Sequence, residues 1–165
     1  MFGKKGNKGQ EDPVKMYASS RTNLLLVIIL TVVNIGLYMS GSESIMLFSA
    51  TIPYYSVVLP LVWGIYRFLT VGIVIAVVFL LGYLVCWIMS KKNYKWLIGA
   101  LILFVIDTIG MIGLYIWAGE VSGFLDVAIH ALILFYLIRG IKYGKQLATP
   151  VEVQETDNTE TVEEI

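Results

Sequence analysis

Four long runs of apolar residues divide the chain, and short polar segments separate them. A helix that crosses a bilayer needs about 20 mostly apolar residues, with a range of about 17–25. The first run is short, but Arg21 precedes it and Tyr38 lies at its far end, so we read it as an uncleaved span. The pattern predicts an all-α integral membrane four-helix bundle. Its expected spans cover residues 24–39, 70–89, 96–118 and 121–143.

A fifth apolar segment, 45–66, differs because polar and helix-breaking residues interrupt it. Pro53 and Pro60 remove backbone donors, and serine, threonine and tyrosine residues make its centre amphiphilic. If this segment spanned, the lysines of 91–95 would move to the side opposite the other basic residues. We therefore expect an interfacial segment on the outer face or a re-entrant element covered by protein or water, with a fifth span as a third alternative.

The basic residues predict an orientation. Eleven of the twelve lysines and arginines precede the first span, lie between the second and third, or close the fourth, and Arg67 alone lies at the other ends. The positive-inside rule then places both termini in the cytoplasm. Since topology explains these charges, we predict the lipid bilayer as a partner and no nucleic acid.

Composition supports the membrane class and separates the two ends of the chain. Hydrophobic residues make up 58% of the chain and charged residues 15%, against about 25% charged residues in typical soluble domains. The leader, 1–23, is basic, whereas 146–165 carries six of the twelve acidic residues. We predict that both are flexible cytoplasmic segments that flank a transmembrane domain of 24–145.

Two ionisable residues lie deep in consecutive spans. Asp107 is near the middle of the third span, and His130, the only histidine, would reach the same depth in a hairpin. A carboxylate at the bilayer centre costs about 2.5–3.5 kcal/mol, so it seldom lies there without a partner. Asp126 is a competing acid nearer the outer interface. Further hydrogen bonds to the pair are expected from Thr31, Asn34 and Thr108.

This pair has two interpretations. In the first, it joins two helices, and the chain is a small accessory or interaction subunit in a homo-oligomer or beside another membrane protein. In the second, the pair responds to protons, and the chain is a proton-linked small-solute carrier or a channel component. The sequence contains no H-E-x-x-H, G-x-S-x-G, phosphate-loop or dinucleotide motif, so we predict neither an enzyme nor a bound metal or cofactor.

Two glycine pairs have the small-xxx-small spacing that favours close helix contact. They are Gly119-x-x-x-Gly123 and Gly140-x-x-x-Gly144. Both pairs fall at the ends of expected spans, so we take them as weak indications of helix packing and interpret them as ordinary boundary glycines.

Three stretches of the chain resemble a group of small uncharacterised multi-pass membrane proteins of Gram-positive bacteria. The stretches read FSATIPYY, SKKNYKWLIGALILFVIDTIG and LDVAIHALILFYLIRGIK. The likeness runs from Ser20 to Lys145 and includes Asp107 and His130. It implies four spans in a bacterial plasma membrane and no particular activity. That group has a longer and more polar outer segment after IPYY, which is short and apolar here.

Overall fold

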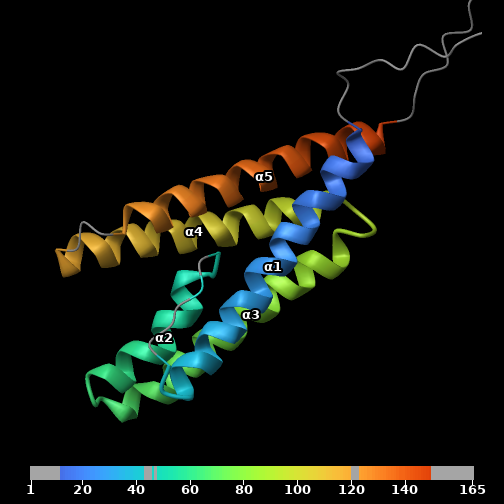
Figure 1. Ribbon diagram of the computed structural model, residues 1–165. Coiled ribbons are helices and arrows are strands. Elements are labelled where there is room, and N and C mark those ends of the chain that lie inside the picture. The colour runs from blue at the N-terminus through green and yellow to red at the C-terminus, as the bar shows by residue number, and fades with distance from the viewer. Residues whose placement is uncertain (1–11, 43–45, 47, 120–122, 150–165) are drawn as a thin grey trace, which may run out of the picture.

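The structure, a computed structural model, describes residues 12–42, 46, 48–119 and 123–149. Within these residues it contains five α-helices, one 3₁₀ turn and no strand (Figure 1). The elements are α1 (Pro13–Met39), α2 (Thr51–Val62), η1 (Tyr66–Phe68), α3 (Leu69–Met89), α4 (Lys95–Ala118) and α5 (Phe124–Ala148). Four helices, α1, α3, α4 and α5, are long and apolar enough to cross a membrane. The predicted all-α, four-span architecture is confirmed.

The four long helices converge at one end and separate at the other (Figure 1). At the converging end, which holds Pro13, the connection 90–94 and Ala148, α1 packs on α5, and α4 contacts both α3 and α5. At the diverging end, which holds Met39, Val62 and Ala118, α4 and α5 lean away from α1 and α3. Helix α2 fills the wedge between them and packs mainly on α3.

Small residues bring the helices together at the converging end. A Cβ atom added to Gly140 would lie 2.5 Å from the Ser20 Cβ, and one added to Gly144 would lie 2.5 Å from the Tyr94 Cβ. The Ser20 hydroxyl also donates a hydrogen bond of 2.7 Å to the Tyr136 carbonyl across this contact. The interpretation of Gly140 and Gly144 as ordinary boundary glycines was therefore wrong.

The helices extend beyond the expected spans at both ends of the chain. Helix α1 begins at Pro13 because Asp12 caps it, with the Asp12 side chain accepting a 3.0 Å hydrogen bond from the Val14 N–H. Residues 13–23 are thus helical, which corrects the predicted flexible leader of 1–23. Helix α5 likewise continues through 146–148, the beginning of the predicted tail. Residues 1–11 and 150–165 of the predicted flexible ends, together with 121–122 of the fourth expected span, lie outside the described residues.

Helix α2 accommodates both of its prolines. Pro53 lies in the first turn, where a backbone N–H would have no intrahelical partner. Pro60, in the last turn, cannot donate to the Ser56 carbonyl, which instead faces α3 at Gly72. A Cβ atom added to Gly72 would lie 1.8 Å from this oxygen. The Ser56 carbonyl, which has no helical donor at Pro60, thus packs against Gly72, where any side chain would collide with it.

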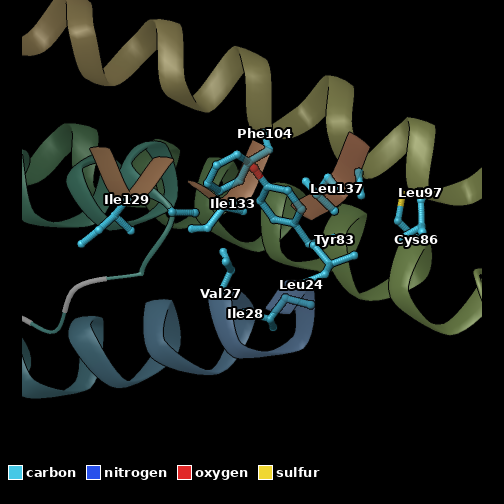
Figure 2. Close-up of a cluster of buried hydrophobic side chains, with 12 residues drawn as sticks. Leu24, Val27, Ile28, Tyr83, Cys86, Leu97, Phe104, Ile129, Ile133 and Leu137 are labelled. Carbon is cyan, nitrogen blue, oxygen red and sulfur yellow. The ribbon is translucent and has the colours of Figure 1, made fainter. Parts of the chain in front are cut away.

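The hydrophobic core lies where α1, α3, α4 and α5 meet (Figure 2). Its largest fully buried side chains are aromatic, Tyr83 from α3 and Phe104 from α4. Leu24 from α1 and Leu137 from α5 complete the packing around them. This apolar layer lies on the converging side of the residues that form the candidate site.

Candidate functional site

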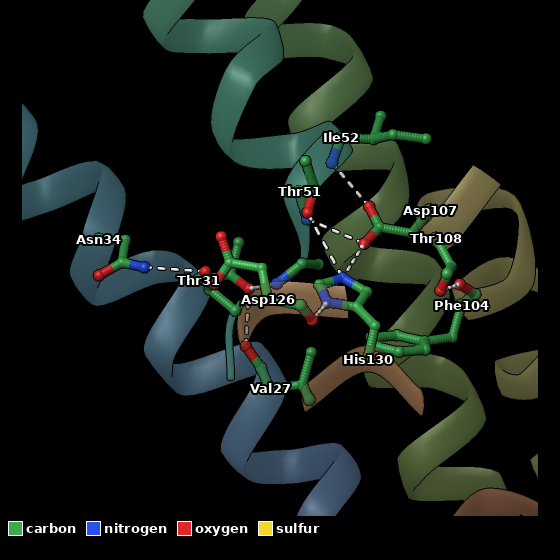
Figure 3. A network of polar contacts seen from close by, with 12 residues as sticks. Val27, Thr31, Asn34, Thr51, Ile52, Phe104, Asp107, Thr108, Asp126 and His130 are labelled. Carbon is green, nitrogen blue, oxygen red and sulfur yellow. Dashed lines mark hydrogen bonds and ion pairs between the residues drawn. The ribbon is translucent and has the colours of Figure 1, made fainter. Parts of the chain in front are cut away.

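The structure brings Asp107 and His130 into contact, as the sequence predicted (Figure 3). Asp107 Oδ2 and His130 Nε2 are 3.2 Å apart. Asp107 is 0% exposed and His130 is 3% exposed. The pair therefore lies away from bulk solvent, where an ionised group depends on its protein partners.

The main partners of Asp107 are backbone groups that sequence reasoning missed. The Thr51 N–H donates to Oδ2 over 2.9 Å, and the Ile52 N–H donates to Oδ1 over 2.6 Å. Both belong to the first turn of α2, where N–H groups have no partner inside the helix. The N-cap residue, Ala50, offers no capping side chain. Asp107 of α4 therefore caps α2 from outside and places a negative charge at the positive end of the helix dipole.

His130 is held on several sides. Its Nδ1 atom lies 2.9 Å from the backbone carbonyl oxygen of Asp126, one turn earlier in α5. The ring stacks on Phe104 with a centroid distance of 4.9 Å and an interplanar angle of 20°. Its Nε2 atom faces the Thr51 hydroxyl at 3.4 Å in addition to Asp107. These contacts fix the orientation of the imidazole.

Helix α1 positions residues that lead into α2, at 46 and 48–50. The side-chain amide of Asn34 donates to the Met46 carbonyl over 2.7 Å and to the Ser49 hydroxyl over 2.9 Å, and its oxygen accepts from the Met46 N–H. The Thr31 hydroxyl accepts a 2.7 Å hydrogen bond from the Ala50 N–H. The sequence predicted that these side chains would bind the ionisable pair. Instead they bind the backbone that delivers α2 to it.

Two other predicted residues do not join the pair. The Thr108 hydroxyl donates to the Phe104 carbonyl of its own helix over 2.7 Å instead of binding the pair. The Asp126 carboxylate accepts a short hydrogen bond from the Tyr115 hydroxyl, so only the backbone of Asp126 contacts His130. Of the two candidate acids, Asp107 alone reaches the imidazole with its carboxylate.

The exposure of α2 changes along its length. Ala50 is 0% exposed at the start of α2, whereas Val62 at its end is 59% exposed. Helix α2 therefore begins inside the bundle and runs back to its edge, and whether 45–66 is interfacial or re-entrant stays a prediction. Of this segment, 45 and 47 lie outside the described residues.

A small polar cavity of about 60 Å³ lies beside His130. Its lining comes from the segment that leads into α2, from the first turns of α2, and from Tyr115, Asp126 and Ile129. On the other side of His130, Phe104 and the apolar core close the bundle. The cavity therefore borders His130 on the side where the start of α2, Tyr115 and Asp126 lie.

The described part of the chain contains no group of three histidine, cysteine, aspartate or glutamate side chains that could hold a metal ion. The arrangement can hold and orient a proton, and it can fix a helix end. Comparison with known proteins assigns no function to this site. No family model, curated protein or solved structure matches the chain.

Proposed function

We propose that this chain is a small accessory or interaction subunit of a membrane assembly, in which the Asp107–His130 pair anchors α2. One observation carries this proposal. Each of the four polar side-chain atoms of the pair has a partner within the chain: both carboxylate oxygens and both ring nitrogens. A buried charge satisfied in this way supports a defined structure and leaves no group directed at a substrate. The proposal assigns no catalytic step to the pair.

The proposed setting is the bacterial plasma membrane, with both termini in the cytoplasm. The clustered lysines and the resemblance to Gram-positive membrane proteins support it. In the structure the basic connection 91–95 lies at the converging end, together with Pro13 and Ala148. The long helices direct apolar side chains outward, among them Ile109 and Ile138. These surfaces suit lipid, a second copy of the chain or another membrane protein.

A second candidate is a component of a proton-linked carrier or channel. The cavity beside His130 is the observation that favours it, because it brings a polar path to an ionisable pair. The apolar layer around Phe104 disfavours it, because that layer blocks continuation of the path toward the converging end.

Two measurements on Asp107→Asn separate the candidates, with Asp126→Asn as the matched control. In native membranes, the accessory role predicts that the wild-type chain migrates in a complex of defined size, which Asp107→Asn disrupts and Asp126→Asn preserves. In liposomes loaded with a pH-sensitive dye, the accessory role predicts that liposomes containing the purified chain conduct no more protons than protein-free liposomes. Proton or solute flux that the folded Asp107→Asn variant abolishes would contradict the accessory role.

Single-cysteine labelling tests the proposed orientation. Glu43→Cys, Asn93→Cys and Glu120→Cys are introduced separately in a Cys86→Ser background, which removes the only native thiol. An impermeant maleimide added to intact cells is expected to label the cysteines at 43 and 120 but not the cysteine at 93. Labelling at 93 from outside would overturn the orientation.

A further inference from the structure

The hydrogen bonds of His130 determine where its protons lie. Its Nδ1 atom is 2.9 Å from the Asp126 carbonyl oxygen, and a carbonyl only accepts, so Nδ1 carries a hydrogen. A neutral imidazole with hydrogen on Nδ1 presents a lone pair at Nε2. That lone pair would face Asp107 Oδ2 at 3.2 Å, which places two acceptors in contact. The contact is favourable only when one further proton lies between these atoms.

The backbone of α2 decides which side of the contact carries that proton. The Asp107 carboxylate accepts the Thr51 and Ile52 N–H groups, and hydrogen bonds of this kind favour the ionised carboxylate. The positive end of the α2 dipole acts in the same direction. We propose that Asp107 and His130 form a proton-binding site, occupied as an imidazolium–carboxylate pair, and that the bound proton holds the start of α2 in the bundle.

The cavity gives this proton a route to one side. Its volume of about 60 Å³ exceeds the roughly 10–15 Å³ that one water needs, and its lining includes polar side chains such as Ser49, Thr51 and Tyr55. His130 borders it and is slightly exposed, whereas Asp107 is not exposed. Phe104 covers the opposite face of the imidazole, with Leu24 and Leu137 in the apolar layer. Proton exchange therefore proceeds from the diverging end.

Few other titratable groups face this site from the described residues. Tyr54 and Tyr55 of α2, Tyr115 of α4 and Asp126 of α5 line the cavity, and no lysine or arginine does. Tyr83 of α3 is buried and close enough to interact electrostatically with Asp107. Helix α1 contributes the uncharged Thr31 and Asn34, and its Tyr38 packs edge to face on Tyr54 with a centroid distance of 6.4 Å. His130 is thus the one basic side chain among the described residues of the cavity wall.

Loss of the proton has a structural consequence. The carboxylate would then face a lone pair inside a region of low dielectric, and the electrostatic attraction that holds the contact would be lost. Because Asp107 also binds the first turn of α2, that helix would loosen from the bundle. The inference concerns the contact itself and holds for an accessory subunit as well as for a carrier component.

The single histidine allows a direct test by nitrogen NMR. A chain labelled with ¹⁵N-histidine and purified in micelles has one imidazole, so its two nitrogen signals need no assignment among sites. At neutral pH the wild-type chain is expected to show both nitrogens protonated. Asp107→Asn is expected to show a neutral ring with hydrogen on Nδ1, because an amide N–H can donate to Nε2. Asp126→Asn retains the backbone carbonyl and is expected to match the wild type.

A neutral wild-type ring at neutral pH would overturn the proposal, whether or not either variant folds. Labelling of Val58→Cys in the Cys86→Ser background tests the movement of α2, since Val58 is 4% exposed. In sealed vesicles, raising the pH on the diverging side is expected to increase the rate of maleimide labelling severalfold more at Val58→Cys than at the exposed Val62→Cys, because the thiolate fraction of both cysteines rises with pH. Raising the pH on the converging side is expected to have no effect. An equal pH dependence at the two cysteines would overturn the coupling of the proton to α2.

Discussion

Two helix ends in this molecule are satisfied by side chains of other helices, and they differ in burial. At the C-terminal end of α3, Arg21 of α1 donates to the Ser90 hydroxyl over 2.8 Å and to the Trp87 carbonyl over 3.3 Å. At the N-terminal end of α2, Asp107 accepts two backbone N–H groups. Each charge has the sign that the adjacent helix dipole favours. Arg21 is partly exposed, whereas Asp107 is fully buried and contacts His130.

This comparison indicates what burial adds to a helix cap. Water can replace the hydrogen bonds of a partly exposed arginine, so its loss leaves few groups without partners. Asp107 is fully buried, and its removal would leave two N–H groups and an imidazole without their acceptor. The charged cap thus adds modest stability at the C-terminal end of α3, whereas the N-terminal end of α2 depends on its cap. The predictions below test this difference.

Removal of the buried charge is expected to have the largest effect. Asp107→Ala leaves His130 and the first N–H groups of α2 without an acceptor, and breaking a buried pair in this way costs about 3–5 kcal/mol. The measurement is the free energy of unfolding in mixed micelles. Asp126→Ala, which removes a partly exposed carboxylate, is the control and is expected to cost much less. Equal losses in the two variants would contradict the special role of the buried cap.

A steric change at the α2–α3 contact is expected to come next. Gly72→Ala places a Cβ atom against the Ser56 carbonyl oxygen, so α2 must shift, at an expected cost of about 1–3 kcal/mol for overpacking. Gly113→Ala is the matched control, because no atom lies within 4 Å of its added Cβ. Unfolding free energies are compared for the two variants. If Gly72→Ala left the free energy of unfolding unchanged, the Ser56 carbonyl of α2 would not pack against Gly72 of α3.

Loss of the exposed cap is expected to be milder. Arg21→Ala removes hydrogen bonds at the end of α3 that water can replace, so we expect a loss of about 1 kcal/mol. The same unfolding measurement applies, with the exposed Lys92→Ala as the control. A loss as large as that of Asp107→Ala would refute the comparison between the two caps.

The smallest expected effect is at the converging end. Ser20→Ala removes one hydrogen bond between α1 and α5, and such contacts average about 0.6 kcal/mol. Thr22→Ala is the control, since the Thr22 hydroxyl bonds only the Ala18 carbonyl of its own helix. If Ser20→Ala lowered the free energy of unfolding by several kcal/mol, hydrogen bonding rather than close packing would be the main source of stability at the converging end.

The sequence predicted the spans and the ionisable pair for a physical reason. Apolar length alone marks a spanning helix, and an acid at mid-span with one histidine on the next helix leaves few choices of partner. The N–H partners of Asp107 were harder to foresee because backbone donors have no sequence signature. Pro53 was a usable signal: proline is favoured in the first turn of a helix, so it indicated a helix start near Thr51.

Other features depended on tertiary contacts that periodicity does not encode. The sequence singled out Asn34 and Thr31 as polar residues that would bind the pair, but their partners belong to the segment that leads into α2, which has no repeating pattern. Gly140 and Gly144 had the spacing of packing glycines, yet only the position of α1 beside α5 shows which helix they admit.

Cross-linking of α2 to α4 tests the central claim most directly, namely that α2 begins inside the bundle beside Asp107. The side chain of Ile52 lies 3.0 Å from a Cβ atom added to Gly110, whereas no atom lies within 4 Å of one added to Gly113. In a Cys86→Ser background, Ile52→Cys with Gly110→Cys is expected to form a disulfide on mild oxidation, detected as a linked peptide by mass spectrometry. Ile52→Cys with Gly113→Cys is expected to remain reduced. Equal cross-linking of both pairs, or of neither, would contradict the inserted position of α2.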